Sequence, residues 1–152
     1  VTHDQHEALS LADHLVLLDA GRCVQAGPPR ELFDHPASLF AARFLGTPPM
    51  NVHPCAEVAG GLGPGLGGPD TVVGWRPGDA RTSPVTEPGL WLAGTVELTE
   101  YTGDAVLVHV TGPGTSWTAV APPRAAPQVG DPFTVYIARD DLHTFPSTSV
   151  PR

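Results

Sequence analysis

The first third of the chain places apolar residues at helical spacing. Asp4 precedes Glu7 by three residues, which is typical of a capping box at a helix start. Apolar residues then recur at positions 8, 11, 12 and 15, so we predict about three turns of amphipathic helix. Two short apolar runs, 15–18 and 23–26, flank the turn-forming segment 19–22 and predict a β-hairpin.

Two further helices are expected before position 47. Pro29 is well placed to open a short helix that ends at Asp34. Pro36 is expected to open the next one, which carries Phe40 and Phe44 on its core-facing side and is capped by Gly46.

From position 51 onward the pattern changes to short alternating segments between Gly and Pro. Val106, Val108 and Val110 share one face of a predicted strand, whereas Leu107 and His109 share the other. We predict strands at 72–75, 91–99, 105–110, 116–120 and 133–137. Five short strands separated by turn signals favour a small OB-type barrel, which Trp91 and Trp117 are expected to fill. The glycine-rich segment 60–70 is interpreted as a loose loop, and the tail from position 144 as frayed.

The charge balance narrows the function classes. The chain has 16 acidic and 8 basic residues, a net charge of −8, and all its basic residues are Arg. Nucleic-acid binding is disfavoured because phosphate neutralisation needs clustered cations. No apolar run approaches a membrane span. The chain opens with Val1 and polar residues instead of a leader, so we expect that a segment upstream has been cut away.

The opening segment Val-Thr-His-Asp-Gln-His-Glu-Ala, residues 1–8, resembles the switch-histidine segment of ABC ATPases. Segments 11–22 and 25–33 resemble the stretches that follow it in this family. Segment 44–51 is similar to the exit of the sugar-importer branch, which serves maltose, multiple sugars and glycerol phosphate. The resemblance implies that His3 is the catalytic switch, which donates a hydrogen bond to the γ-phosphate of ATP in an intact ATPase.

The second half is similar to the TOBE regulatory domain of the same branch. Segments 73–79, 94–97, 100–104 and 129–131 carry this resemblance, together with Leu142 and His143. Trp75 and Gly78 stand where the family usually has other residues. The implied fold class is α+β: residues 1–50 form the C-terminal part of an ABC ATPase domain, and residues 51–152 form an all-β, OB-like TOBE barrel that includes the loop 60–70.

The resemblance also defines what the chain lacks. A Walker A loop needs a lysine that reaches the phosphates, and this sequence has no Lys. The signature loop and Walker B would lie upstream of Val1, so we predict that the chain alone does not hydrolyse ATP. No cofactor is expected for the fragment, whereas the intact family uses ATP and magnesium.

In the intact family the partners are membrane-spanning importer subunits and a second ATPase subunit, on the cytoplasmic face of the cell membrane. Whether this chain forms a homodimer stays an open question, and no nucleic-acid partner is expected. The apolar faces of the first helix and hairpin would normally pack on the ATPase core, so their exposure predicts self-association.

Other interpretations compete with this one. A stand-alone TOBE-type module that binds a small ligand, and a truncated remnant without a function, both stay open. A metal site at His3, Asp4 and His6 is disfavoured by the spacing. The GxGxxG match at 63–68 is interpreted as chance. Trp75 and Arg76 either contact a partner or form a buried Trp with Arg on a turn.

Overall fold

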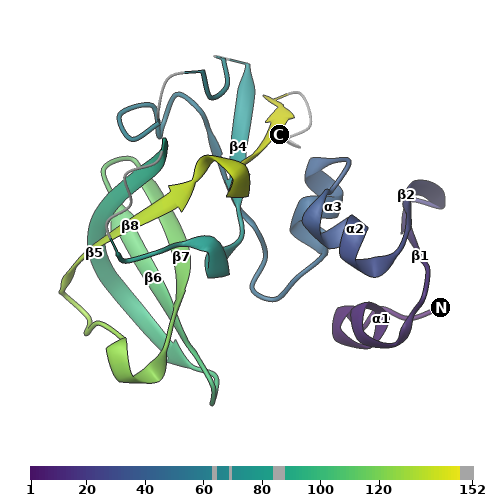
Figure 1. The fold of residues 1–152 in the computed structure, drawn as a ribbon, viewed down its shortest axis with the longest axis horizontal. Coiled ribbons are helices and arrows are strands. Elements are labelled where there is room, and N and C mark those ends of the chain that lie inside the picture. The colour runs from purple at the N-terminus through teal and green to yellow at the C-terminus, as the bar shows by residue number, and fades with distance from the viewer. Residues whose placement is uncertain (63–64, 69, 84–87, 148–152) are drawn as a thin grey trace. The chain divides into compact units, whose positions relative to one another are not determined.

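The structure is a computed structural model that describes residues 1–62, 65–68, 70–83 and 88–147 (Figure 1). The described residues form two compact units, Val1–Met50 and Asn51–Ser147. The first contains three helices and a hairpin, and the second is built of two antiparallel sheets, so the predicted α+β class is confirmed. Among the described residues, no helix has the length and apolar character that crossing a membrane requires.

The first unit packs its hairpin and two later helices around a small core. The core consists of Leu17, Leu32, Ala41 and Leu45. A bulge between Leu17 and Leu18 interrupts the hairpin register. In chain order the elements are α1 (Gln5–Leu11), β1 (Leu15–Asp19), β2 (Arg22–Gly27), α2 (Pro29–Asp34) and α3 (Leu39–Phe44).

Local capping sets the ends of these helices. The Asp4 carboxylate accepts the Glu7 N–H at 3.0 Å, as expected for a capping residue. The helix is shorter than predicted, because Ala12 is already extended and position 15 begins β1. For α3 the prediction of a start at Pro36 is wrong, since the Ser38 hydroxyl accepts the Ala41 N–H and the helix begins one residue later.

The cap of α1 leads to a prediction about how stability depends on pH. The hydrogen bond from the Glu7 N–H holds the pKa of the Asp4 carboxyl below its usual range. A depressed acid pKa stabilises the fold at higher pH, and this contribution is lost as the pH falls through the lowered pKa. Asp4→Asn should keep the cap and abolish its loss in acid, because the amide oxygen accepts without titrating. Urea denaturation at several pH values should show a smaller loss of stability in acid for the variant than for the wild type; an equal loss in the two proteins would contradict the assignment.

The second unit consists of two antiparallel sheets. One has the order β3-β4-β9 and the other β7-β6-β5-β8. Two 3₁₀ turns lie on connections between the sheets, η1 (Pro77–Asp79) and η3 (Arg139–Asp141), and η2 (Pro123–Ala125) joins β7 to β8 within the larger sheet. The strands are β3 (Asn51–Pro54), β4 (Thr71–Trp75), β5 (Gly89–Tyr101), β6 (Val106–Gly112), β7 (Thr115–Ala121), β8 (Pro132–Ala138) and β9 (His143–Pro146).

The long strand β5 joins two partners. Its first half pairs with β8 and its second half with β6. Figure 1 shows β5 as a long curved ribbon. A register shift between Val96 and Leu98 accompanies the bend, because a bulge increases the local twist. Val106, Val108 and Val110 are buried as their alternation predicted, and pack with Trp117 in one hydrophobic core.

Side chains fasten β3 to the outer strand β7. The Asn51 amide group donates to the Thr118 carbonyl and accepts the Thr118 N–H, both at 2.8 Å. Two residues along, the Thr115 hydroxyl lies 2.8 Å from Nδ1 of His53. The amide of Asn51 therefore replaces a neighbouring strand at this point of the sheet edge.

Several predictions for this unit need correction. The described part of the unit has seven strands and not five, because β3 and β9 were missed. The tail is not frayed at 144–146, where Thr144 and Phe145 pair with β4, and positions 148–152 lie outside the described residues. Within the predicted loop 60–70, Leu62 forms a bridge with Leu90; positions 63, 64 and 69, which include part of the GxGxxG match, also lie outside.

The aromatic predictions were partly right. Trp117 is buried in the core, but Trp91 is 42% exposed, so the prediction that it fills the barrel was wrong. Trp75 and Arg76 are both buried, which favours the interpretation of a buried Trp followed by an Arg on a turn over that of a partner contact. The rings of Phe40 and Phe44 stack at 5.4 Å; Phe40 packs against the core as predicted, whereas Phe44 is 39% exposed and does not belong to it.

Candidate functional site

The predicted switch residue, His3, lies in the exposed bend before α1. The residues on either side of it are tied to the helix. The Thr2 hydroxyl donates to the Glu7 carboxylate at 3.0 Å and accepts the Asp4 N–H at 3.0 Å. Together with the Asp4 cap, these bonds fix the backbone around His3 and leave its imidazole in solvent, where it can meet a ligand or another domain.

Two glutamines of the motif segments have structural contacts that sequence reasoning missed. The Gln5 side chain accepts the Gly46 N–H at 2.9 Å and so links the start of α1 to the end of α3. The Gln25 amide donates to the His35 carbonyl and accepts the Ala37 N–H, at 3.0 and 2.9 Å. Both positions stood in quoted motifs, but a motif does not reveal which backbone groups a side chain satisfies.

The first unit also has exposed apolar side chains, as expected for α1 and the hairpin. Leu11 is 77% exposed, and Val16 and Leu18 are each 55% exposed. The helix α1 buries none of its residues. A cluster of exposed aliphatic side chains of this kind is typical of a surface that another protein segment covers.

A polar network covers the outer face of the larger sheet. His109 lies between two partners: Nε2 is 2.7 Å from the Glu100 carboxylate and Nδ1 is 3.1 Å from the Thr118 hydroxyl. Beside it, the Thr111 hydroxyl donates to the Glu97 carboxylate at 2.6 Å. The alternation in β6 had already placed His109 opposite the buried valines. Its two partners come from other strands and were not predictable locally.

A second charged group lies between η1 and η3. Arg81 donates to the Asp141 carboxylate at 2.9 Å. Burial raises the pKa of the nearby Asp79 carboxyl, and the negative charge of Asp141 adds to this effect. The fold therefore holds Asp79 in an environment that penalises its ionised form.

This pKa gives a stability prediction. An acid whose pKa is raised on folding destabilises the folded state above that pKa, and the penalty is relieved as the pH falls through it. Asp79→Asn should therefore raise the free energy of unfolding at neutral pH, and the gain should shrink in acid. Urea denaturation at several pH values measures it. Asp140→Asn changes an exposed neighbour and is the control; its free energy of unfolding should stay within about 0.5 kcal/mol of the wild type. An effect of Asp79→Asn that does not change with pH would refute the raised pKa of Asp79 as its cause.

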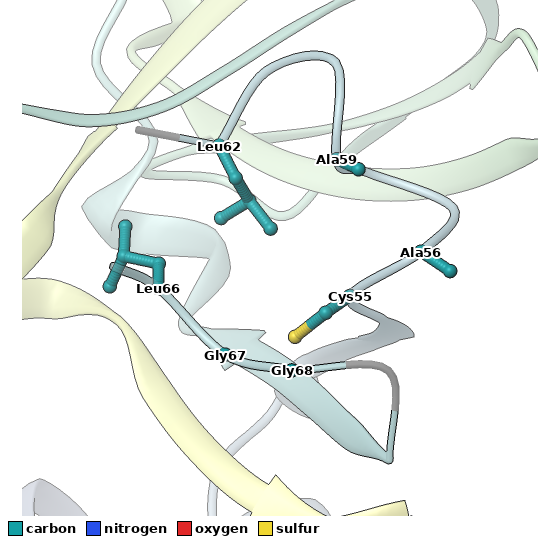
Figure 2. Close-up of a pocket in the computed structure, with 7 residues that line it drawn as sticks. All are labelled: Cys55, Ala56, Ala59, Leu62, Leu66, Gly67 and Gly68. Carbon is teal, nitrogen blue, oxygen red and sulfur yellow. The ribbon is translucent and has the colours of Figure 1, made fainter. Parts of the chain in front are cut away.

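A shallow pocket of about 330 Å³ lies beside Cys55. Figure 2 shows the Cys55 sulfur, Leu62 and Leu66 pointing toward it, while Ala56, Ala59, Gly67 and Gly68 complete its wall. Burial raises the pKa of the Cys55 thiol, so it is protonated near neutral pH. The seven described lining residues include no charged side chain that could orient a ligand, and specific sites usually have a few such groups.

Metal chemistry has no support in the described part of the chain. It contains no group of three or more His, Cys, Asp or Glu side chains arranged to hold an ion. His3, Asp4 and His6 lie close in sequence, but they do not form such a group.

Comparison with protein families gives one match. Residues 73–145 match the TOBE domain family. The match begins within β4 and ends within β9, and thus contains both the Arg81–Asp141 pair and the His109 network.

Curated relatives extend the likeness to the first unit. The sn-glycerol-3-phosphate import ATP-binding protein UgpC 3 of Rhizobium johnstonii is 42% identical over 79% of this chain and 35% of its own length. UgpC 3 of Rhizobium etli is 38% identical over 97% of the chain and 44% of its own length. The alpha-glucoside transport ATP-binding protein AglK of Rhizobium meliloti is 40% identical over 74% of the chain and 35% of its own length. The chain thus spans less than half the length of these relatives.

Proposed function

The chain belongs to the ATP-binding subunits of ABC importers and contains their TOBE domain, and from this membership we propose that it is the regulatory and coupling end of such a subunit. The observation that carries the proposal is the likeness to relatives across nearly the whole chain, 97% of it in one case. At that coverage the likeness extends over both the first unit and the TOBE region.

His3 is proposed as the switch histidine of the complete ATPase. An imidazole can donate a hydrogen bond to a phosphate oxygen and respond to its removal. The support is positional: the Thr2–Glu7 and Asp4–Glu7 bonds fix the backbone on both sides of an exposed His3. ATP and magnesium would be held by the remainder of the subunit, since this chain has no lysine to serve a phosphate-binding loop.

The exposed apolar side chains Leu11, Val16 and Leu18 are proposed to pack on the ATPase core of the same subunit. A second ATPase subunit and membrane-spanning importer subunits are the proposed partners, which would place the chain on the cytoplasmic face of the membrane. A sugar is the proposed substrate class, with an α-glucoside as the candidate that the name of AglK suggests; the name of UgpC gives glycerol phosphate, a polyol phosphate, as the alternative. The TOBE unit would take the regulatory contacts, including a homodimer contact.

A chimaera tests the proposal. Residues 1–147 would replace the matching part of AglK, whose name assigns it to α-glucoside transport. We expect the chimaera to hydrolyse ATP, and His3→Ala to lower hydrolysis at least about tenfold, because a group that contacts the reacting phosphate contributes at least that much. His6→Ala, at an exposed histidine on α1, is the matched control and should retain activity. An active chimaera that His3→Ala leaves unchanged would refute the assigned role.

The chain by itself should not hydrolyse ATP. The purified protein should release phosphate at the same rate as its His3→Ala variant, because the lysine of a Walker A loop is absent from the sequence. Phosphate release above that control would contradict the proposal that the remainder of the subunit holds ATP and magnesium.

A further inference from the structure

Trp91 is the tryptophan whose ring reaches solvent. It is 42% exposed, whereas Trp75 and Trp117 are buried. It lies directly opposite Tyr136 of β8, and the two ring centroids are 5.0 Å apart at an angle of 52°. Tyr136 is fully buried, and its hydroxyl donates to the Pro88 carbonyl. The exposed indole therefore rests on a fixed support, so a ligand that covers it would restrict little additional motion.

Glycine makes this support possible. A Cβ atom at Gly89 would lie 2.7 Å from the Tyr136 ring, so a larger residue there would displace the ring on which Trp91 rests. On the far side of β5, the backbone N–H of Trp91 donates to the carbonyl of Gly61, which fixes the backbone at this position. Trp91 thus has a supported ring and a fixed backbone, while part of its side chain is exposed.

A charged pair lies on the same face. The backbones of Arg81 and Tyr136 exchange two hydrogen bonds of 2.8 Å, so Tyr136 has Trp91 on one side and Arg81 on the other. Directly opposed residues of antiparallel strands point to the same face. With strands about 4.8 Å apart, the Trp91 and Arg81 backbones are separated by about 10 Å. Arg81 holds Asp141 at 2.9 Å, and both side chains are partly exposed.

We propose that Trp91, Arg81 and Asp141 form a binding ledge for a neutral pyranoside. A sugar ring has an apolar C–H face that can cover an indole and a rim of hydroxyls that both donate and accept. The Arg81 guanidinium supplies donors and the Asp141 carboxylate supplies acceptors for that rim. This combination of an apolar surface with a few oriented polar groups is what small-molecule sites generally use.

The charges select against anionic ligands. Arg81 is already neutralised by Asp141, and the chain carries a net charge of −8. A free phosphate ester would meet no uncompensated cation on the ledge and would be repelled at long range. The inference goes beyond the proposed function and does not rest on it: the ledge is tested on the chain alone, whereas the chimaera tests the importer role.

Quenching of tryptophan fluorescence reports on Trp91, because the two buried tryptophans, Trp75 and Trp117, are shielded from a quencher in solution. Methyl α-glucoside should reduce acrylamide quenching of the 152-residue protein, with a Kd of about 1–10 mM, as expected for one open contact surface. sn-Glycerol 3-phosphate at equal concentration should not reduce it. Unchanged quenching with the glucoside, or equal protection by the phosphate ester, would overturn the proposal.

Variants locate the contact by saturation-transfer NMR of the glucoside. Trp91→Ala should weaken binding at least about tenfold, Trp91→Phe should retain part of it, and Arg81→Gln should weaken it about fivefold through lost polar contacts. Tyr101→Ala removes another exposed aromatic from β5 and should change nothing. Circular dichroism would establish that each variant is folded. A folded Trp91→Ala that binds as the wild type does, or a loss of binding in Tyr101→Ala, would place the sugar elsewhere and refute the ledge.

Discussion

Trp117→Ala should lower the free energy of unfolding by about 3–5 kcal/mol, which is the usual cost of deleting a large buried aromatic side chain. Trp117 is 3% exposed on β7 and stacks at 6.0 Å on Phe133 of β8. Its ring thus fills the interior between the two outer strands of the four-stranded sheet, and its loss would leave a cavity between β-strands that the sheet hydrogen bonds prevent from collapsing. Urea denaturation followed by circular dichroism measures the change.

The matched control is Tyr101→Ala. Tyr101 is 70% exposed at the end of β5, so removing its ring should change the unfolding free energy by no more than about 0.5 kcal/mol. A comparable loss in the two variants would mean that Trp117 is not the filled interior position described here.

Gly94→Ala should cost about 1–3 kcal/mol, because it would overpack a position where two strands approach closely. A Cβ atom at Gly94 would lie 2.6 Å from the Thr111 carbonyl oxygen and 2.8 Å from a methyl group of Val110. Both neighbours belong to β6, at the point where β5 passes from β8 to β6. A backbone oxygen cannot rotate away as a flexible side chain can, so the strand itself must shift.

Gly60→Ala provides the comparison for this variant. A Cβ at Gly60 would meet no atom within 4 Å, and Gly60 does not have a positive φ. Alanine should therefore be neutral or should stabilise by about 0.4–1 kcal/mol through the unfolded chain. Thermal unfolding of both variants tests the contrast; equal effects would show that close approach does not explain the glycine at position 94.

Local patterns predicted the elements whose determinants lie close together in sequence. The valines of β6 predicted its buried face, and Asp4 predicted the cap of α1. The four-residue strands β3 and β9 were missed because their pairing with β4 depends on residues far along the chain. A short segment without alternation carries no local signal for such pairing.

The wrong prediction that Trp91 fills the barrel has a different cause. Leu90 and Leu92 are buried and Trp91 lies between them, so the two-residue period of a strand already indicated that the indole faces outward. The hydrophobicity of tryptophan predicts burial, whereas the position of Trp91 in the strand predicts exposure, and the position decides. His3 was located by its motif, but what it acts on is a property of the complete subunit and not of these residues.

The amide of Asn51 also bears on how the protein behaves at high concentration. An uncovered outer strand presents unpaired backbone groups on which the strand of another molecule can add, and this is a route to fibrils. The backbone N–H and C=O of Thr118 are both bonded to the side chain of Asn51, 67 residues away in sequence, so no other strand can pair with β7 at this residue. Protection of the edge at Thr118 therefore depends on the Asn51 amide, and chemical deamidation of Asn51 would replace its N–H donor with a carboxylate and leave the Thr118 carbonyl without this donor.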